Sequence, residues 1–562
     1  MHNQGCSVTH VTVTTRPTRT KATGAWADGD RTPLNDVEVL KHEDDALNVR
    51  QRILDVYSQQ GFSSIAPSDL TGRFRWMGLY TQRKPGLDGT HTGEDDIADE
   101  RFMMRIRTDG GKLSTEQVRV VAGISRDFAR GTADVTNRQN IQLHNVRIED
   151  VPRIWERLES VGMMTTEACG DCPRGMLCSP VAGIERDEIV DGTRAVEEIR
   201  RRWIGQPEFS NLPRKYKTAV SGSPRHDVAH EINDISFVGV VHPEHGPGFD
   251  VWVGGGLSVK PVLARRLGAW VPLEEVPEVW HGVTSIFRDH GYRRLRNKAR
   301  LKFLVQDWGP ERFREVLETE YLGRRLVDGP EPTVPEGTRR DHVGIHEQHD
   351  GNVWVGATTV GGRVGAEGLF RVAEIAEEVG SARVRVTPHQ KVLVLDVPPA
   401  RAESVARRLE EVDLHVFPSE WRRNVLACTG LEYCKLALTD TKNRARWTVE
   451  ELEKRLPDID IPFSIHVNGC PNACARSQVG DVGLKGMLEK RADGTHQEVF
   501  QVLLGGSLAE DTALARKARN LKVAGDDLPD YIERLARAYL DQRAAGESFH
   551  SWARRADEED LR

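Results

Sequence analysis

Several features typical of secreted, membrane or nucleic-acid-binding proteins are missing from this sequence. Its 562 residues include only 8 cysteines, too few for a disulfide-rich secreted protein. No apolar run approaches the length of a membrane-spanning helix, and no secretory signal opens the chain. The formal net charge of −7 gives no overall basic character. The sequence therefore predicts a cytoplasmic protein that binds neither nucleic acid nor a membrane.

A nucleotide-cofactor fingerprint is missing as well. No G-x-G-x-x-G motif follows a predicted strand, so we expect neither a flavin nor a nicotinamide domain. The chain is nevertheless too long for one hydrophobic core, and its 38% hydrophobic and 29% charged residues are ordinary for a globular protein. The sequence predicts several domains, and any electrons that they use come from a separate carrier.

The N-terminal segment is unusual in composition. Residues 1–27 contain no Asp or Glu and many threonines. Because no amphipathic, arginine-rich helix is apparent, we predict a disordered tail over residues 1–32, with a transit peptide as the alternative. Cys6, in this tail, is expected to have no role.

The cysteines that are present fall into two groups. Cys428 and Cys434 are separated by five residues, and Cys470 and Cys474 by three. Paired zinc ligands commonly have two residues between them, so the wider spacings favour a [4Fe–4S] cluster, in which each iron takes one thiolate. Two helices with buried structural cysteines are the alternative. The other group consists of Cys169, Cys172 and Cys178.

The chain also contains an internal repeat with an offset of 251 residues. The offset relates Gly110 to Gly361, Thr136 to Thr387, Gln139 to Gln390 and Phe249 to Phe500. Between these positions, both copies place apolar residues at i, i+3 and i+4, the pattern of one helical face. Ser114 and Gln117 form a candidate capping box at the start of the first helix. Each copy predicts strand, Gly-Gly turn, helix, strand, turn, strand and helix.

The repeat predicts a fold class. We expect an α+β (mixed α/β) protein in which a half of about 250 residues is duplicated around a pseudo-twofold axis. Residues 324–340, with three prolines, are the expected linker between the halves.

The two halves differ where chemistry is expected. Segment 168–180, with Arg174, is the counterpart of the segment that holds Cys428 and Cys434. Segment 212–222, with Lys215 and Lys217, is the counterpart of segment 461–474. Cations from one half that face a metal site from the other predict the reduction of an anion at their interface.

These motifs together resemble the sirohaem-dependent sulfite and nitrite reductases, over about residues 60–550. The resemblance is carried by the cysteine spacing, FMMRIR (102–107), DVTNRQNIQ (134–142), CPR…SPVAG (172–183) and KYK (215–217). WMGLYTQR (76–83) and TTEACGDCPR (165–174) are similar to the actinobacterial ferredoxin-dependent sulfite reductases.

The resemblance implies a division of the chain. It implies a ferredoxin-like domain built from both repeats and two α/β domains that hold a sirohaem between them. The expected divisions are the N-terminal segment with the first ferredoxin-like half-domain (33–162), a sirohaem- and substrate-binding domain (163–325), the linker with the second half-domain (326–418), and a cluster- and sirohaem-binding domain (419–562).

The resemblance also implies roles for individual residues. Cys428, Cys434, Cys470 and Cys474 would ligate the [4Fe–4S] cluster, and Cys474 would also be the axial ligand of the sirohaem iron. The implied catalytic residues, which neutralise the oxyanion and deliver protons to it, are Arg105, Arg174, Lys215 and Lys217. The expected contacts to the sirohaem carboxylates are Arg107, Arg138, Asn140, Gln142, Arg300 and Lys302.

A covalent link is a further implication. A tyrosine of the GLYTQR motif is joined to a cysteine beside the sirohaem in the actinobacterial enzymes, which maps onto Tyr80 and Cys169. Cys172 is the competing partner, and an unlinked tyrosine and thiol are the alternative. A zinc site from Cys169, Cys172 and Cys178 is a further alternative, for which no fourth ligand is evident.

The function implied is that of an assimilatory sulfite reductase. The expected reaction is the six-electron reduction of sulfite to sulfide, with reduced ferredoxin as donor, in a monomeric enzyme. A ferredoxin-dependent nitrite reductase that makes ammonia is the alternative, and Lys217 favours sulfite because a dianion gains more from an additional cation. A non-catalytic iron–sulfur or zinc protein remains a more remote alternative.

Overall fold

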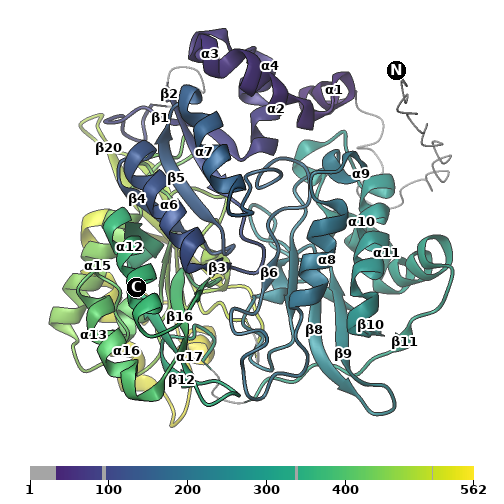
Figure 1. Cartoon of the computed structure of the whole chain (residues 1–562). Helices are drawn as coiled ribbons and strands as arrows, with labels where there is room; N and C mark the ends of the chain where they lie inside the picture. Colours follow the sequence, from purple (N-terminus) through teal and green to yellow (C-terminus); the bar gives the residue numbers. More distant parts are fainter. Residues whose placement is uncertain (1–32, 92–96, 336–338, 509–510) are drawn as a thin grey trace, which may run out of the picture.

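The computed structural model describes residues 33–91, 97–335, 339–508 and 511–562 (Figure 1). The predicted tail 1–32, with Cys6, lies outside the described residues. At the start of the described chain, a small group of short helices covers one end of the molecule (purple in Figure 1). These helices are α1 (Asp36–Glu43), α2 (Val49–Arg52), α3 (Ser58–Gln60) and α4 (Pro67–Thr71). The Asn35 side chain caps α1 by accepting the N–H of Glu38.

Two five-stranded sheets form the centre and exchange one strand each. The first has the order β1 (Leu79–Arg83), β2 (Ala98–Ile106), β5 (Ile141–Val146), β4 (Thr132–Val135) and β14 (Arg363–Gly365). The second has the order β12 (Gly344–Glu347), β13 (Val353–Thr358), β16 (Lys391–Val397), β15 (Arg383–Val386) and β3 (Lys112–Ser114). Each sheet thus ends with a strand from the other half, and Val364 pairs with Ala133 as Leu113 pairs with Val384.

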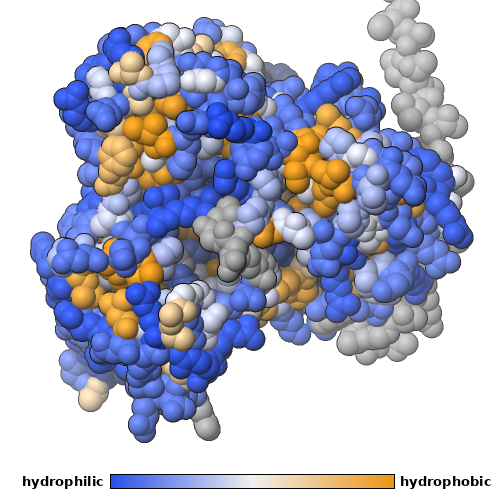
Figure 2. All heavy atoms as spheres, turned by 90° about the horizontal axis from the view of Figure 1, so that it is seen from below, coloured by the Kyte–Doolittle hydropathy of each residue, from blue (hydrophilic) through white to orange (hydrophobic). Residues whose placement is uncertain are grey.

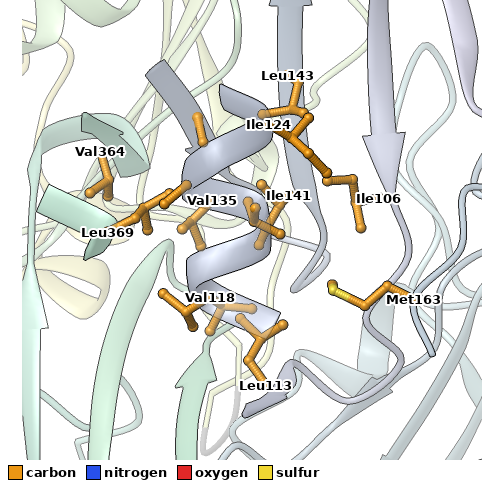
Figure 3. Close-up of a cluster of buried hydrophobic side chains, with 14 of the residues drawn as sticks. Ile106, Leu113, Val118, Ile124, Val135, Ile141, Leu143, Met163, Val364 and Leu369 are labelled. Carbon is orange, nitrogen blue, oxygen red and sulfur yellow. The ribbon is translucent and has the colours of Figure 1, made fainter. Parts of the chain in front are cut away.

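Among the described residues, four α-helices belong to this central part, namely α6 (Thr115–Phe128), α7 (Val151–Glu159), α12 (Ala366–Glu378) and α13 (Ala402–Glu410). Of these, α6 and α12 pack against each other between the halves. The predicted capping box of Ser114 and Gln117 is confirmed at the start of α6. Figure 3 shows Val364 and Leu369 of the second half beside the helix that carries Val118 and Ile124. Because each such side chain contributes about 2 kcal/mol when buried, this shared core holds the two halves together.

Two further sheets, one of six strands and one of five, flank the centre. One has the order β11 (Val327–Asp328), β10 (Arg265–Val271), β9 (Gly246–Val253), β8 (Ile235–His242), β7 (Thr218–Ser221) and β6 (Leu177–Cys178). The other has the order β17 (Val425–Ala427), β18 (Ile465–Asn468), β19 (Val482–Lys490), β20 (His496–Leu504) and β21 (Arg516–Ala524). In both, two parallel pairings are followed by antiparallel ones. The helices of these parts are α8 (Thr193–Trp203), α9 (Pro207–Ser210), α10 (Val276–His290), α11 (Leu301–Val316), α14 (Glu420–Arg423), α15 (Lys442–Arg455), α16 (Leu528–Gln542) and α17 (Phe549–Arg555).

Two buried glutamines display the pseudo-twofold relation in atomic detail. The Gln139 side chain donates to the carbonyl oxygens of Gly110, Cys178 and Val386 and accepts the N–H of Cys178. The Gln390 side chain donates to the carbonyl oxygens of Gly361, Val135 and Ala427 and accepts the N–H of Ala427. Each glutamine therefore ties a central sheet to the first strand of a flanking sheet. The predicted duplication within a mixed α+β fold is confirmed.

Candidate functional site

The four C-terminal cysteines follow two neighbouring parallel strands. Cys428 comes directly after β17, and Cys470 and Cys474 follow β18. The carboxyl ends of parallel strands meet at one edge of a sheet, which is where α/β proteins place their ligands. Burial and the neighbouring thiols Cys474 and Cys470 raise the pKa of Cys428 to about 12. The pKa of Cys434 is raised to about 12 by burial and by Cys428 and Cys474, so all four sulfurs lie near one another.

This donor set fits an iron–sulfur cluster. Thiols with such raised pKa values lose their protons only to a strongly positive centre. The backbone N–H of Gly469 points at Sγ of Cys428 at 3.3 Å, the type of contact that tunes cluster ligands. Among the described residues, no three His, Cys, Asp or Glu side chains are arranged to hold a single metal ion. A cubic cluster holds its thiolates further apart than one zinc ion does.

A group of buried and half-buried cations faces this cysteine site. Lys215 and Lys217 lie just before β7, and Arg174 lies before β6. Burial and repulsion by Arg300 and Arg174 lower the pKa of Lys215 to about 7, while Cys474 acts in the opposite direction. The thiol of Cys474 therefore lies close to these cations, which come from the first half of the chain.

The other predicted cations complete the group. Burial and repulsion by Arg138 and Arg300 lower the pKa of Lys217 well below its usual value. Burial and repulsion by Arg476, Arg174 and Arg105 lower the pKa of Arg138 to about 9. So many mutually repelling cations in one buried place predict a polyanionic occupant. A macrocycle with many carboxylates, together with a small oxyanion, fits this chemistry.

We call the space between the cysteine site and the facing cations the recess. Seen from below, the molecule is hollowed between its lobes, and hydrophilic residues border the hollow (blue in Figure 2). Arg105 stands at the end of β2, where its guanidinium donates to Sγ of Cys169 and to Oε1 of Gln142, both at 3.2 Å. Nε of Arg174 donates to the carbonyl of Gly170 at 2.8 Å. Backbone contacts thus fix the orientation of the Arg174 side chain.

Two of the expected sirohaem contacts are engaged with the protein itself. Arg107 is buried and donates to Asp109 at 2.6 Å and to three carbonyl oxygens of the 167–174 loop. Lys302, also buried, donates to the carbonyl oxygens of Gly256, Leu257 and Lys260. Both side chains hold loops at the border of the recess.

Three of the remaining expected contacts, Arg138, Asn140 and Arg300, also bond to groups of the protein. Arg138 donates to Oδ1 of Asn233 and to the carbonyl of Gly175, each at 2.6 Å. The Asn140 side-chain oxygen accepts the N–H of Thr108 at 3.3 Å. Arg300 forms a buried ion pair with Asp234.

The structure distinguishes the three cysteines of the first half. Burial and Cys169 raise the pKa of Tyr80, so the Tyr80 hydroxyl and the Cys169 thiol are neighbours. Cys172 instead turns inward, with Sγ 2.8 Å from the carbonyl oxygen of Cys169. Cys178 lies in β6, near Asp191 and Glu188, so these thiols are not gathered for zinc.

The pseudo-twofold relation identifies a second set of four positions that the repeat offset alone did not reveal. The offset falls from 251 to 249 at Cys178 and Ala427, which contact equivalent glutamines. In the next loop the residue-number offset between the halves falls to 247. Residues with a left-handed backbone mark this offset, because His226 and Ala229 (φ 51° and 52°) in the first half correspond to Ala473 and Arg476 (φ 53° and 61°) in the second. At these offsets, Cys428, Cys434, Cys470 and Cys474 correspond to Ser179, Glu185, Ser223 and Asp227.

This correspondence corrects one interpretation of the sequence. Arg174, Lys215 and Lys217 do not take the places of the thiolates, because Lys217 corresponds to Ser464. The first half fills the ligand places with oxygen groups that bond to one another. Ser179 donates to Asp227 at 2.8 Å, and the Ser223 hydroxyl, near Glu185, accepts the N–H of Arg225. Hydrogen bonds thus replace the cluster there.

Sequence reasoning missed two residues of the site. Arg476 is buried and donates to the carbonyl of Asn137 at 2.7 Å, and the Asn137 side chain reaches back to the carbonyl of Cys474. Its position two residues after Cys474 was an available signal. Asp234 is fully buried beside Arg300, and only its counterpart Asp481, at the 247 offset, would have indicated it.

Fold and site together define a class of protein, namely an iron–sulfur oxidoreductase that acts on a small anion. Comparison with protein families agrees. The nitrite and sulphite reductase 4Fe-4S domain matches residues 169–326 and 420–562. The nitrite/sulfite reductase ferredoxin-like half domain matches residues 96–161 and 346–412. The chain belongs to the nitrite and sulfite reductase family.

Similar proteins extend along the whole chain. It is 56% identical to "Sulfite reductase [ferredoxin] 1" of Mycolicibacterium paratuberculosis, over 98% of this chain and 100% of that protein. It is 34% identical to the "Ferredoxin--nitrite reductase" of Synechococcus elongatus, over 89% of this chain and 96% of that protein. The solved structure of the Mycobacterium tuberculosis NirA protein is 54% identical and superposes with a TM-score of 0.93, covering 96% of this chain and 99% of that one.

The comparisons confirm the family resemblance and the fold class. No helix among the described residues is long and apolar enough to cross a membrane.

Proposed function

We propose that this protein is a ferredoxin-dependent sulfite reductase, which reduces sulfite to sulfide in six electrons. The observation that carries the proposal is the contact of the Asn137 side chain, next to the cation Arg138 of the first half, with the carbonyl oxygen of Cys474 in the second half. The names of the relatives with 54–56% identity over 98% of the chain support it.

The proposed cofactors are a [4Fe–4S] cluster and a sirohaem. Cys428, Cys434, Cys470 and Cys474 hold the cluster, and Cys474 also serves the sirohaem iron. When bound, the two groups would supply electrons to the substrate anion. Arg138, Arg300, Asn140 and Gln142 contact the sirohaem carboxylates, whereas Arg107 and Lys302 hold the loops beside them.

The cations of the recess bind the substrate and move its protons. Arg105, Arg174, Lys215 and Lys217 surround the sulfite oxygens and neutralise their charge. A pKa of about 7 allows Lys215 to donate a proton at neutral pH and to recover it from solvent. The oxygens of sulfite then leave as water. The guanidinium groups remain charged throughout and hold the anion in position.

Nitrite is the second candidate substrate, because relatives with 34% identity are named nitrite reductases. Lys217 favours sulfite, since the more highly charged dianion gains more from another cation. A reduced dye with either anion distinguishes the two functions. We expect kcat/KM for sulfide formation from sulfite to exceed that for ammonia formation from nitrite, and the reverse order would reject sulfite as the main substrate.

We further propose a thioether between Tyr80 and Cys169. The two groups are neighbours, and Arg105 contacts the same sulfur at 3.2 Å. Loss of one hydrogen from the ring and one from the thiol joins the ring to the sulfur, and the two electrons and two protons pass to dioxygen, which is reduced to hydrogen peroxide. Peptide mapping of the purified enzyme should recover one linked peptide that is lighter by two hydrogens than its two parts. Separate, unmodified peptides would reject the link.

The same enzyme needs a docking surface for ferredoxin, which we place at a groove beside the cluster. The groove, of about 440 Å³, is bordered by Pro471, next to Cys470, and by Lys485, Lys490 and His496. Burial and repulsion by Lys517 lower the pKa of Lys485, which places a further cation nearby. Ferredoxins are acidic, so opposite charges would guide their approach to the cluster.

Charge reversal tests this surface. Exchange of both Lys485 and Lys490 for Glu should raise KM for ferredoxin on the order of tenfold and leave turnover with a reduced dye unchanged. Lys454→Glu is a matched control, because Lys454 is an exposed lysine of α15. An equal rise of KM in the control, or an unchanged KM in the double variant, would place ferredoxin elsewhere.

We also propose that the enzyme is a cytoplasmic monomer with the domain divisions 33–162, 163–325, 326–418 and 419–562.

A further inference from the structure

One buried carboxylate connects two cations of the recess. Asp234 lies just before β8 and is 0% exposed. Its Oδ2 accepts the backbone N–H of Lys217 at 2.9 Å, and its own N–H donates to the carbonyl of Lys217 at 2.9 Å. The Arg300 guanidinium donates to both carboxylate oxygens at 2.8–3.0 Å. The backbone of Lys217 and the head group of Arg300 are therefore fixed by the same residue.

We propose that Asp234 is a positioning residue of the anion site, which fixes the backbone of Lys217 at the substrate oxyanion and the head group of Arg300 beside it. Asp234 does not itself contact the anion, which its negative charge would repel. It acts through the two cations, and the inference rests on the proposed sulfite reductase function.

The charges around Lys217 support this role. Arg138, Arg300 and Lys215 repel its ammonium group and lower its pKa, and Asp234 opposes them. Among the groups that influence Lys217, Asp234 is the carboxylate that compensates three cations. Without it, the cations would repel one another, and side chains as long as lysine and arginine would move apart.

The second half of the chain offers an internal comparison. Asp481, the counterpart of Asp234, accepts the N–H of Ser464 at 2.9 Å and the hydroxyl of Ser464 at 2.7 Å. Ser464 corresponds to Lys217, so the carboxylate-to-backbone contact is a shared element of the fold. The contact to an arginine and the nearby lysine ammonium belong to the first half alone. A variant of Asp481 therefore measures the structural part of the contact.

Three variants separate positioning from simple charge compensation. Asp234→Asn keeps an oxygen for the Lys217 N–H but loses the ion pair with Arg300. Asp481→Asn makes the equivalent change in the second half. The double variant Asp234→Asn with Arg300→Gln removes both members of the buried ion pair, so that neither is left without its partner.

The measurement is the dissociation constant of sulfite from the oxidised holoenzyme, followed by the change in its visible absorption. Melting temperature and the separate values of KM and kcat with a reduced dye accompany it. In Asp234→Asn, we expect the dissociation constant and KM to rise on the order of tenfold, the size expected for losing a charge-assisted hydrogen bond. The double variant should regain the melting temperature but not the affinity. Asp481→Asn should lower the melting temperature and leave the sulfite affinity unchanged.

An unchanged dissociation constant in Asp234→Asn would overturn the proposal. So would wild-type affinity in the double variant, because Asp234 would then only neutralise Arg300. If Asp234→Asn does not fold, Asp234→Glu keeps the charge, displaces the carboxylate by one methylene and is expected to show the same loss of affinity. Failure of the wild type to make sulfide would reject the proposed function, while the dissociation constants, measured without turnover, still decide the role of Asp234.

Discussion

The variants Gln390→Met and Gln139→Met remove equivalent hydrogen bonds, one set from each half. They are predicted to lose similar stability but to differ in their iron content. Both glutamines are buried, at 5% and 0% exposure, and methionine matches their length and volume. Each side chain makes three donor contacts and one acceptor contact to backbone groups. The amide has only two N–H hydrogens, so its three donor contacts amount to two hydrogen bonds. With the acceptor bond, and at about 1 kcal/mol net for each, either variant should lose about 3 kcal/mol of stability.

The difference lies in what each glutamine supports. Gln390 bonds to both backbone groups of Ala427, the residue before Cys428, so its loss releases a cluster ligand. Gln139 bonds to Cys178, and the next residue is Ser179, which holds no metal in our proposal. Iron and acid-labile sulfide per chain should fall in Gln390→Met and remain at the wild-type level in Gln139→Met, with similar decreases in melting temperature. Equal iron content in the two variants, at similar stability, would refute the conclusion that Gln390 supports the cluster through Ala427 and Cys428.

Three further predictions concern single residues. Lys217→Asn should lower the ratio of kcat/KM for sulfite to that for nitrite about tenfold, the size of one charge-assisted contact, and an unchanged ratio would remove the reason for preferring sulfite. Cys474→Ser should lose the cluster and the sirohaem absorption bands, whereas Cys178→Ala should keep both; normal spectra for Cys474→Ser would reject its place at the junction. Burial raises the pKa of Glu167 from 4.5 to about 7. Between these two pH values the native state keeps a proton that the unfolded chain has released, so the free energy of unfolding falls as the pH rises from about 4.5 to 7. Glu167→Gln should remove this loss of about 3 kcal/mol, and melting curves that keep the wild-type pH dependence would contradict the assignment.

The sequence predicted the elements that have strong local patterns. The capping box of Ser114 and the apolar faces of α6 and α12 follow from helical periodicity, and the structure contains them. The exchange of β3 and β14 could not be predicted, because strands of three residues carry no alternating pattern. Arg105 and Arg107 have identical local signals. They separate only in three dimensions, where Arg107 turns into the 167–174 loop and Arg105 meets Cys169.

The first-half counterparts of the four cysteines, Ser179, Glu185, Ser223 and Asp227, could not be found from a fixed offset, because the loops differ in length between the halves. A constant offset of 251 relates Gln139 to Gln390 and Phe249 to Phe500, but the shorter loops between them reduce it to 249 and then to 247. The β19–β20 hairpin, residues 482–504, is four residues longer than the β8–β9 hairpin, residues 235–253, and restores the original offset. An alignment at one fixed offset therefore fails in the segment where the active site lies.

The two halves have loops of the same backbone path but hold these loops together differently, and this difference makes the site asymmetric. Both loops need left-handed residues at two equivalent positions, so their path is kept whether or not a cluster is present. In the second half, the Gly469 N–H contacts Sγ of Cys428 and the Leu438 N–H donates to the carbonyl of Gly469, but the four thiols do not bond to one another as the oxygen groups of the first half do and are available for a cluster. In the first half, Asp227 accepts from Ser179, Ser221 and His342, which joins the same loops by hydrogen bonds. Because that half needs no cluster for its loop structure, its neighbouring residues Lys215 and Lys217 are available for the anion.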